Sequence, residues 1–108
     1  MTISKDFPQI TNRRIASNGI ELNIAEQGKD DAPLIVMLHG FPESWFSWRH
    51  QFAPLAAAGY HVVAPDMRGY GGSDKPSDIT AYNQVEIVND IKGLVGTLGY
   101  ETAIVIGH

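Results

Sequence analysis

The clearest pattern near the start of the chain is a strict alternation of apolar and polar residues. From residue 20 to residue 24 the sequence reads Ile-Glu-Leu-Asn-Ile, which is the period of two expected for a strand with one buried face. Asn18 and Gly19 stand directly before it, and this dipeptide tolerates the positive φ angles of a type I′ turn. The pattern predicts an antiparallel hairpin in which Thr11–Ser17 pairs with Ile20–Gln27.

Three later segments are apolar without alternation. They are the runs Leu34–Leu38, 62–64 (Val-Val-Ala) and 103–106 (Ala-Ile-Val-Ile). A short run of this kind is typical of a parallel strand that is covered on both faces. The three runs therefore predict the strands of a parallel sheet.

Two helix-like segments separate these runs. Residues 47–58 are interrupted only by Pro54, and residues 82–98 carry apolar side chains at three- and four-residue spacing. Thr80 is the expected N-cap of the second helix, and Gly99 is the expected residue directly after its C-cap. The apolar face of this helix is predicted to consist of Val85, Val88, Ile91, Leu94, Val95 and Leu98.

A hairpin followed by strand, helix, strand, helix and strand indicates an α/β fold with right-handed crossovers. Residues 1–10 are expected to be a leader in which Pro8 interrupts regular structure, and residues 11–108 to be the folded part. The sequence ends two residues after its last buried-type run, whose second face and free edge would be exposed. We therefore expect the chain to be the N-terminal part of a larger domain.

Composition narrows the class of protein. The 108 residues include no Cys, and 8 basic against 12 acidic side chains give a net charge of −4. The absence of cysteine excludes a disulfide scaffold and a thiolate metal site, and the acidic balance offers no basic surface for nucleic acid or anionic lipid. The longest aliphatic run has five residues, whereas a membrane helix needs ~20. The sequence predicts a cytoplasmic protein with neither a nucleic-acid nor a membrane partner.

The first segment that could carry chemistry follows the run Leu34–Leu38 directly. It begins with His39 and Gly40, at the place where ligands bind in open α/β sheets. Pro42 has no N–H, so the N–H of Phe41 is the nearby free donor, and a fixed backbone N–H can stabilise the oxyanion of acyl transfer. The alternative is that His39 and Gly40 simply end a strand and Pro42 begins a loop. The aromatic residues of the segment either line a pocket or, as we expect for three of the four, pack in the core: Phe41, Trp45, Phe46 and Trp48.

Two further segments follow the second and third apolar runs. Residues 66–76 contain three glycines in four positions, but their spacing matches neither of the common phosphate-binding motifs. We expect Asp66 and Arg68 to form an ion pair that pins a tight turn there. Gly107 and His108 stand where the first two residues of a nucleophile elbow would stand, although this pair alone carries little information.

The four histidines do not predict a metal site. His39, His50, His61 and His108 are scattered along the sequence, without the close spacing to one another or to carboxylates that ligands show. His50 and His61 flank the first helix-like segment, and we expect both to lie at the surface or at a helix end. We therefore expect no metal.

Together these segments resemble the α/β-hydrolase superfamily, specifically its epoxide hydrolase branch, from about Arg13 to the last residue. Residues 39–42 (His-Gly-Phe-Pro) look like the oxyanion-hole motif of that family, and residues 43–49 look like the epoxide hydrolase form of the helix that follows. The long first motif is specific. The other matches are residues 58–60 with 66–71, which are similar to the next strand and loop, and Gly107 with His108, which match the start of a Gly-His-Asp-Trp-Gly elbow.

The resemblance implies the N-terminal part of an α/β-hydrolase fold and the conversion of epoxides to vicinal diols through an Asp alkyl ester. It assigns the Phe41 N–H to the oxyanion hole and implies no cofactor. The implied partners are a small apolar epoxide, water and the remaining C-terminal part of the hydrolase. The nucleophile, the cap and the triad acid and base are not in this chain, so the 108 residues alone are expected to be inactive. The implied lining or shaping residues are His39, Gly40, Pro42, Trp45, Gly107 and His108.

Other functions of the same fold remain alternatives. Asp-Trp after His108 would favour an epoxide hydrolase or haloalkane dehalogenase, Asp-Arg a haloacetate dehalogenase, and Ser a serine esterase. An alternative of another class is a non-catalytic fragment or a receptor-like binding module. Such a chain would fold or bind without performing the reaction.

Overall fold

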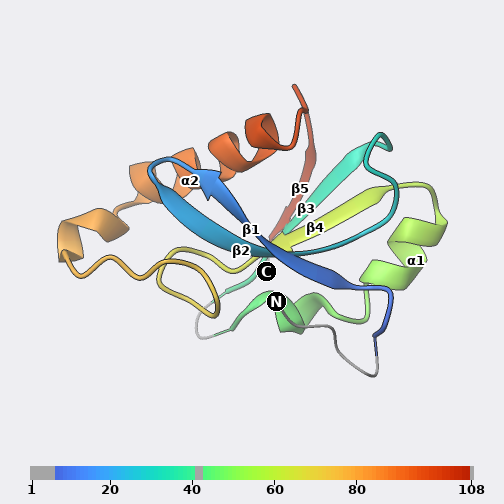
Figure 1. The fold of residues 1–108 in the computed structure, drawn as a ribbon, viewed down its shortest axis with the longest axis horizontal. Helices are drawn as coiled ribbons and strands as arrows, with labels where there is room; N and C mark the ends of the chain where they lie inside the picture. The colour runs from blue at the N-terminus through green and yellow to red at the C-terminus, as the bar shows by residue number, and fades with distance from the viewer. Residues whose placement is uncertain (1–6, 41–42, 108) are drawn as a thin grey trace.

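The computed structural model describes residues 7–40 and 43–107, which fold around one five-stranded mixed sheet (Figure 1). The strand order is β1-β2-β4-β3-β5. β2 pairs antiparallel with both β1 and β4, and β3 runs parallel to both β4 and β5. The strands are β1 (Thr11–Ser17), β2 (Ile20–Gln27), β3 (Leu34–Leu38), β4 (His61–Pro65) and β5 (Ile104–Gly107). The helices are the 3-10 helices η1 (Trp45–Trp48) and η2 (Ile79–Tyr82) and the α-helices α1 (Phe52–Ala57) and α2 (Gln84–Thr97).

The hairpin predicted from the alternating pattern is confirmed. β1 pairs with β2 in antiparallel register, with Ser17 opposite Ile20. The two turn residues both have positive φ angles, 53° at Asn18 and 80° at Gly19, as a type I′ turn requires. The Asn-Gly dipeptide therefore fixes the register of the first two strands.

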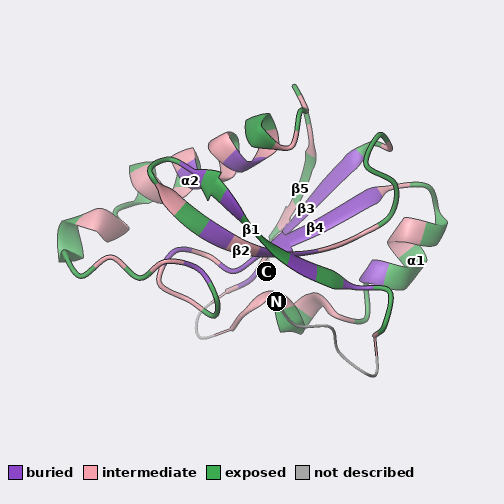
Figure 2. Ribbon diagram, viewed as in Figure 1, coloured by how far each residue is buried: buried purple, intermediate pink, exposed green. Residues whose placement is uncertain are grey.

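The central strands are buried on both faces, as their continuous apolar runs predict. All five residues of β4 and four of the five in β3 are buried (Figure 2). Successive residues point to opposite sides: Ile35 and Met37 join a cluster that packs against α1, whereas Leu34 and Val36 join a cluster that packs against α2. The two α-helices thus cover opposite faces of the sheet. This two-sided burial explains why β3 lacks polar residues.

The first helix-like segment is shorter than its predicted span of 47–58. The chain forms η1 first, with Ser44 as its N-cap, and α1 begins only at Phe52. Pro54 lies in the first turn of α1, where a missing N–H costs no helical hydrogen bond. The interruption lies before Pro54 instead of at it, so Pro54 helps to start the helix.

The second helix begins and ends at well-formed caps, although not at the predicted N-cap. Asn83 caps α2, and its side chain accepts a hydrogen bond from the Glu86 N–H at 2.9 Å. Thr80 lies within η2 instead. At the other end the prediction for Gly99 is confirmed, because it has a φ of 88° and its N–H bonds to the Gly96 carbonyl, while Tyr100 N–H bonds to Val95. These two bonds form a Schellman motif.

The buried face of α2 is narrower than its apolar pattern predicts. Leu94 is fully buried, but Val85 and Val88 are 69% and 56% exposed. The helix packs where it approaches β1: a Cβ on Gly93 would overlap Ser17 Oγ, and Ser17 Oγ donates to the Asp90 carbonyl at 2.6 Å. Val88 lines an open groove between α2 and β5 instead of packing against the sheet.

β5 is the least buried strand of the sheet. Within the described residues it pairs only with β3, and Ile104 and Val105 are 51% and 54% exposed. This agrees with the exposure predicted for the last apolar run. No helix in the described part of the chain has the length and apolar character needed to cross a membrane.

Candidate active site

The carboxyl ends of β3, β4 and β5 lie at one edge of the sheet. These strands are parallel, and Leu38 at the end of β3 stands opposite Gly107 at the end of β5. His39 and Gly40 follow β3 directly, and Asp66 follows β4. The sequence-predicted segments are therefore brought together at the carboxyl edge, where open α/β sheets place their ligands.

His39 joins two of these loops. It is 7% exposed, and its Nε2 accepts a hydrogen bond from the Met67 N–H at 2.9 Å. Because Nε2 accepts, the proton lies on Nδ1, which donates to the Gly40 carbonyl at 3.0 Å. The ring also makes an edge contact with Tyr70, at 5.0 Å between centroids. The side chain of His39 thus fastens the loop after β3 to the loop after β4.

Gly40 and Glu43 stand on either side of residues 41 and 42. The Glu43 N–H donates to the Gly40 carbonyl at 2.8 Å, and the Gly40 N–H donates to Glu43 Oε1 at 3.3 Å. Phe41, Pro42 and His108 lie outside the described residues. The oxyanion role of the Phe41 N–H and the elbow role of His108 therefore stay predictions.

Asp66 does not form the predicted ion pair with Arg68. Its Oδ1 accepts from the Trp45 N–H at 2.8 Å, and its Oδ2 accepts from the Gly72 N–H at 2.9 Å and from Asn23 Nδ2 at 3.0 Å. Asp66 is 2% exposed. This carboxylate therefore gathers three separate segments of the chain around itself.

Arg68 pairs instead with Asp90, a residue of α2. The pair is bidentate, with Nε–Oδ2 and Nη2–Oδ1 distances of 2.8 and 2.7 Å, and both side chains are buried. The hydrogen bond to Asp90 is the main reason why the pKa of Arg68 is raised, and it outweighs burial, which lowers it. The third nitrogen donates to the Ala81 carbonyl at 2.6 Å. Arg68 thus ties the loop after β4 to α2.

Two glycines of the loop 66–76 allow close approach, one to Asp66 and one to Tyr82. Gly71 has a φ of 51°, and a Cβ on it would overlap the Asp66 carboxylate. Gly69 has a φ of 86°, and a Cβ there would overlap the Tyr82 ring. The sequence signal for this arrangement was present, since an aspartate at a strand end followed by several glycines is what a carboxylate wrapped by backbone requires.

Trp45 contributes to the site through its backbone and to the core through its ring. The ring is half-buried and makes perpendicular contacts with Phe46 and Phe52 at 5.4 and 6.1 Å between centroids. It also packs against the cluster on the α1 face. Its role in lining a substrate pocket stays a prediction.

His61 is buried, contrary to the surface position expected from the sequence. It is 2% exposed and opens β4, at the opposite edge of the sheet from His39. Its Nε2 contacts Glu26 Oε1 at 2.9 Å, and its Nδ1 contacts the Tyr100 hydroxyl at 3.0 Å. The expectation failed because Glu26 and Tyr100 are distant in sequence and supply the partners that a buried imidazole needs. His50, in contrast, is exposed as predicted.

Glu26, Asp30 and His61 are the residues best placed to hold a metal, because one ligand atom from each lies within 4.8 Å of the others. The ligand atoms of Glu26 and His61 already have partners, however. Glu26 is paired with Arg13 and is hydrogen-bonded to His61 Nε2. Burial opposes ionisation of Glu26, but the hydrogen bonds from His61 and Arg13 outweigh it and lower its pKa. We describe this group as an ion-pair network.

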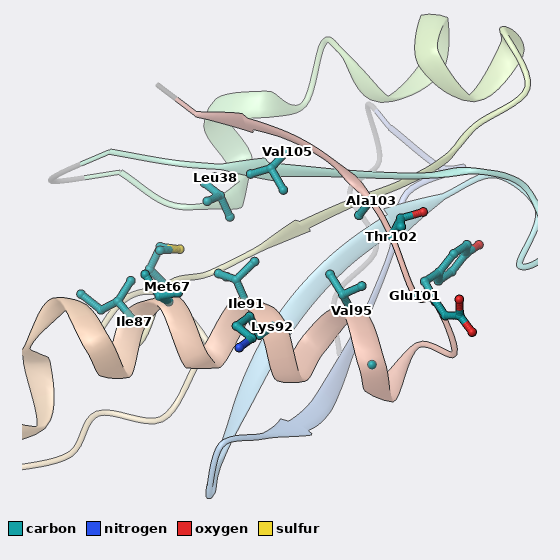
Figure 3. Close-up of a pocket in the computed structure, with 13 residues that line it drawn as sticks. Leu38, Met67, Ile87, Ile91, Lys92, Val95, Glu101, Thr102, Ala103 and Val105 are labelled. Carbon is teal, nitrogen blue, oxygen red and sulfur yellow. The ribbon is translucent and has the colours of Figure 1, made fainter.

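An apolar groove of about 470 Å³ lies between α2 and β5. Figure 3 shows Ile91 and Val95 of α2 pointing toward the sheet, with Leu38 and Val105 on the facing strands. The groove runs along one face of the sheet, whereas His39 and Asp66 lie at its carboxyl edge. It therefore does not belong to the cluster of loops that carries the polar residues.

Comparison with known families identifies the family of this chain. The sequence profile of the family described as alpha/beta hydrolase fold matches residues 33–108. The chain belongs to this family. The family and the α/β-hydrolase fold class predicted from the sequence are thereby confirmed.

Individual relatives of this α/β hydrolase are close in sequence and structure. Epoxide hydrolase A of Mycobacterium tuberculosis is 48% identical over 98 residues, covering 91% of this chain and 30% of its own length. The AB hydrolase superfamily protein YfhM of Bacillus subtilis is 52% identical over 94 residues, covering 87% of this chain and 33% of its own. The crystal structure of epoxide hydrolase A from Mycobacterium thermoresistibile has a TM-score of 0.90 and 47% identity, covering 92% of this chain and 31% of the crystallised one. The chain thus spans about a third of the length of these relatives.

Proposed function

We propose that the protein carrying this chain hydrolyses epoxides to vicinal diols through a carboxylate ester intermediate. The observation that carries the proposal is the group of relatives named epoxide hydrolases, at 41–57% identity to this chain. The pairing of Leu38 with Gly107 supports it, because the proposed oxyanion-donor segment follows the end of β3 and the proposed elbow begins at the end of β5. The substrate is proposed to be a small apolar epoxide, and the second reactant is water.

The proposed reaction has two steps. First, a carboxylate oxygen attacks a ring carbon and forms a C–O bond, and the ring C–O bond breaks. Two tyrosines of the cap donate hydrogen bonds to the ring oxygen, and one of them transfers its proton to make the hydroxyl. Second, water gives a proton to a histidine base and attacks the ester carbonyl. The tetrahedral intermediate then loses the product oxygen, which takes up the proton from the histidine. The carboxylic acid left on the enzyme returns its proton to the tyrosinate, so the carboxylate and both tyrosines are restored and the diol is released.

This chain contributes the groups that flank the ester carbonyl. The Phe41 N–H is proposed as an oxyanion donor, and such a donor is typically worth ~10²–10³ in rate. His39, Gly40 and Pro42 shape its segment, while Gly107 and His108 open the nucleophile elbow. The nucleophile and the remaining triad residues are assigned to sequence beyond His108. Residues 11–108 are proposed to be one portion of the catalytic domain, preceded by the leader 1–10, in a cytoplasmic protein.

The test uses the complete gene product that contains this chain. We expect it to convert styrene oxide to the diol. In a single turnover with excess enzyme in ¹⁸O-water, the first diol should carry unlabelled oxygen, because its new hydroxyl oxygen comes from the carboxylate. The 108-residue chain alone is the control and should be inactive.

Three results would contradict the proposal. Full labelling of the first diol would exclude the ester intermediate. Halide release from haloacetate or haloalkanes without diol formation would instead identify a dehalogenase. Hydrolysis of a simple carboxylic ester without epoxide turnover would identify a serine esterase.

A further inference from the structure

The segment that carries the proposed oxyanion donor is tied on both sides to the loop after β4. Before residues 41 and 42, His39 Nε2 accepts from the Met67 N–H at 2.9 Å. After them, the Trp45 N–H donates to Asp66 Oδ1 at 2.8 Å. The described residues on either side of residues 41 and 42 are therefore held by a loop to which the proposed mechanism assigns no reacting group.

Asp66 is an unusual group to find at this junction. It is 2% exposed, and among residues 7–40 and 43–107 no ion pair joins it to a cationic side chain. A carboxylate is costly to bury unless hydrogen bonds replace its lost water. Here three N–H groups do so, from Trp45, Gly72 and Asn23. Bonds of this kind are short and directional, so the carboxylate fixes the groups around it more firmly than a neutral acceptor would.

The two carboxylate oxygens divide this work. Among the described residues, Oδ1 accepts only from Trp45, on the donor segment, whereas Oδ2 accepts from Gly72 and Asn23, on the loop and on β2. Asp66 is thus the link through which β2 and the glycine loop locate the start of η1. A displacement of Oδ2 is transmitted to Trp45 through the rigid carboxylate plane.

We propose that Asp66 is a positioning residue for the oxyanion hole of this hydrolase. This inference rests on the proposed function. Asp66 touches neither substrate nor reacting atoms; it acts by holding the Trp45 N–H and, through it, the segment that contains Phe41. The inference identifies a residue outside the nucleophile, acid, base and oxyanion donor that sets the rate of one step.

The affected step follows from the chemistry of the two steps. Attack on the epoxide ring places negative charge on the ring oxygen, away from the ester carbonyl. Only hydrolysis of the ester develops an oxyanion on that carbonyl. Loss of the Asp66 clamp should therefore slow ester hydrolysis and leave alkylation nearly unchanged.

The decisive variant is Asp66→Asn, studied in the complete protein. Asparagine keeps the shape, but in either amide orientation its NH₂ faces an N–H donor instead of accepting from it. We expect ester hydrolysis to slow ~10–100-fold, as for a catalytic group moved by about 1 Å, with alkylation within about threefold of wild type. Rapid-quench mass spectrometry should show the alkyl-enzyme accumulating, and kcat and KM should fall together.

Asp74→Asn is the matched control, because this carboxylate also fastens the same loop to β2. Asp74 accepts from the Glu21 N–H at 2.9 Å and pairs with Arg14, but it bonds to none of the described residues 39, 40 and 43–45. It should leave the ratio of the two step rates unchanged. Asn23→Ala removes one bond to Oδ2 and should shift the ratio in the same direction as Asp66→Asn, by about two- to fivefold.

The outcomes separate the inference from the proposed function. Equal slowing of both steps in Asp66→Asn, or the same change of ratio in Asp74→Asn, would overturn the positioning role. If Asp66→Asn does not fold, the ratio measured in Asn23→Ala decides. If wild type forms neither diol nor alkyl-enzyme, the proposed function fails. The clamp itself is then judged by amide exchange, which should be at least tenfold faster for Trp45 in Asn23→Ala than in wild type; unchanged exchange would refute it.

Discussion

The two edges of the sheet hold their carboxylates in different ways. At the carboxyl edge, Asp66 accepts from two backbone N–H groups and one side-chain amide and has no ion pair within the described residues. At the opposite edge, Glu26 is flanked by Arg13 and His61. Asp66 fixes the positions of loops, whereas Glu26 balances the charge of a neighbouring side chain. The difference teaches that the polar groups at the first edge set geometry, whereas those at the second contribute mainly to stability.

The largest expected effect concerns the ion pair between Arg68 and Asp90. This pair involves the loop at the carboxyl edge, but it is held by opposite charges, as Glu26 and Arg13 are at the opposite edge. Asp90→Ala leaves the buried Arg68 guanidinium without its bidentate partner. We expect a loss of about 3–5 kcal/mol in the free energy of unfolding, because an unpaired buried charge is left behind. Urea unfolding of the complete protein measures it. The double variant Arg68→Met with Asp90→Leu should recover much of the loss, and a loss as large as in Asp90→Ala would contradict this account.

The next prediction tests whether Glu26 acts through charge. Its pKa is lowered in the folded protein, so its contribution is present above its ordinary value of 4.5 and is lost as the pH falls through the lowered value. We expect Glu26→Gln to destabilise by about 1.5–3 kcal/mol at pH 7, the usual range for hydrogen bonds to a charged group. Unfolding curves from pH 7 to 3 should show that the variant lacks part of the wild-type decline. Parallel curves would show that the charge of Glu26 is irrelevant.

The smallest predicted effect concerns the N-cap of α2, the helix that carries Asp90. Asn83→Ala removes the side-chain cap of α2 and should lower the free energy of unfolding by about 1 kcal/mol. Thr80→Ala, at the cap position that the sequence favoured, should cost less, since Thr80 lies in η2 and donates to Asp78. Thermal unfolding of both variants distinguishes the two caps. A larger loss for Thr80→Ala would mean that η2, not Asn83, anchors the helix.

The strands were predictable from the sequence because their signals are local. The alternation from residue 20 to 24 and the Asn-Gly turn fix a hairpin without help from distant residues, and the run Leu34–Leu38 can be satisfied only by cover on both faces. The same holds for Gly99, whose positive φ ends α2. In each case a few adjacent residues determine the local conformation.

The errors arose where the deciding partner is distant in sequence. Arg68 has an aspartate two residues away, yet it pairs with Asp90, 22 residues further on, which the packing of α2 brings to it. His61 reads as a helix-end residue until β2 supplies Glu26. Tertiary contacts, unlike turns, leave no signal at a fixed spacing.

The exposure of β5 has a practical consequence for work on this hydrolase. Ile104 and Val105 are more than half exposed, on a strand that pairs on one side only within the described residues. An open strand edge with apolar side chains is a template for intermolecular pairing and aggregation. When the 108 residues are produced in isolation, we therefore expect this last short strand to promote aggregation, and low protein concentration or a fused charged segment to counter it.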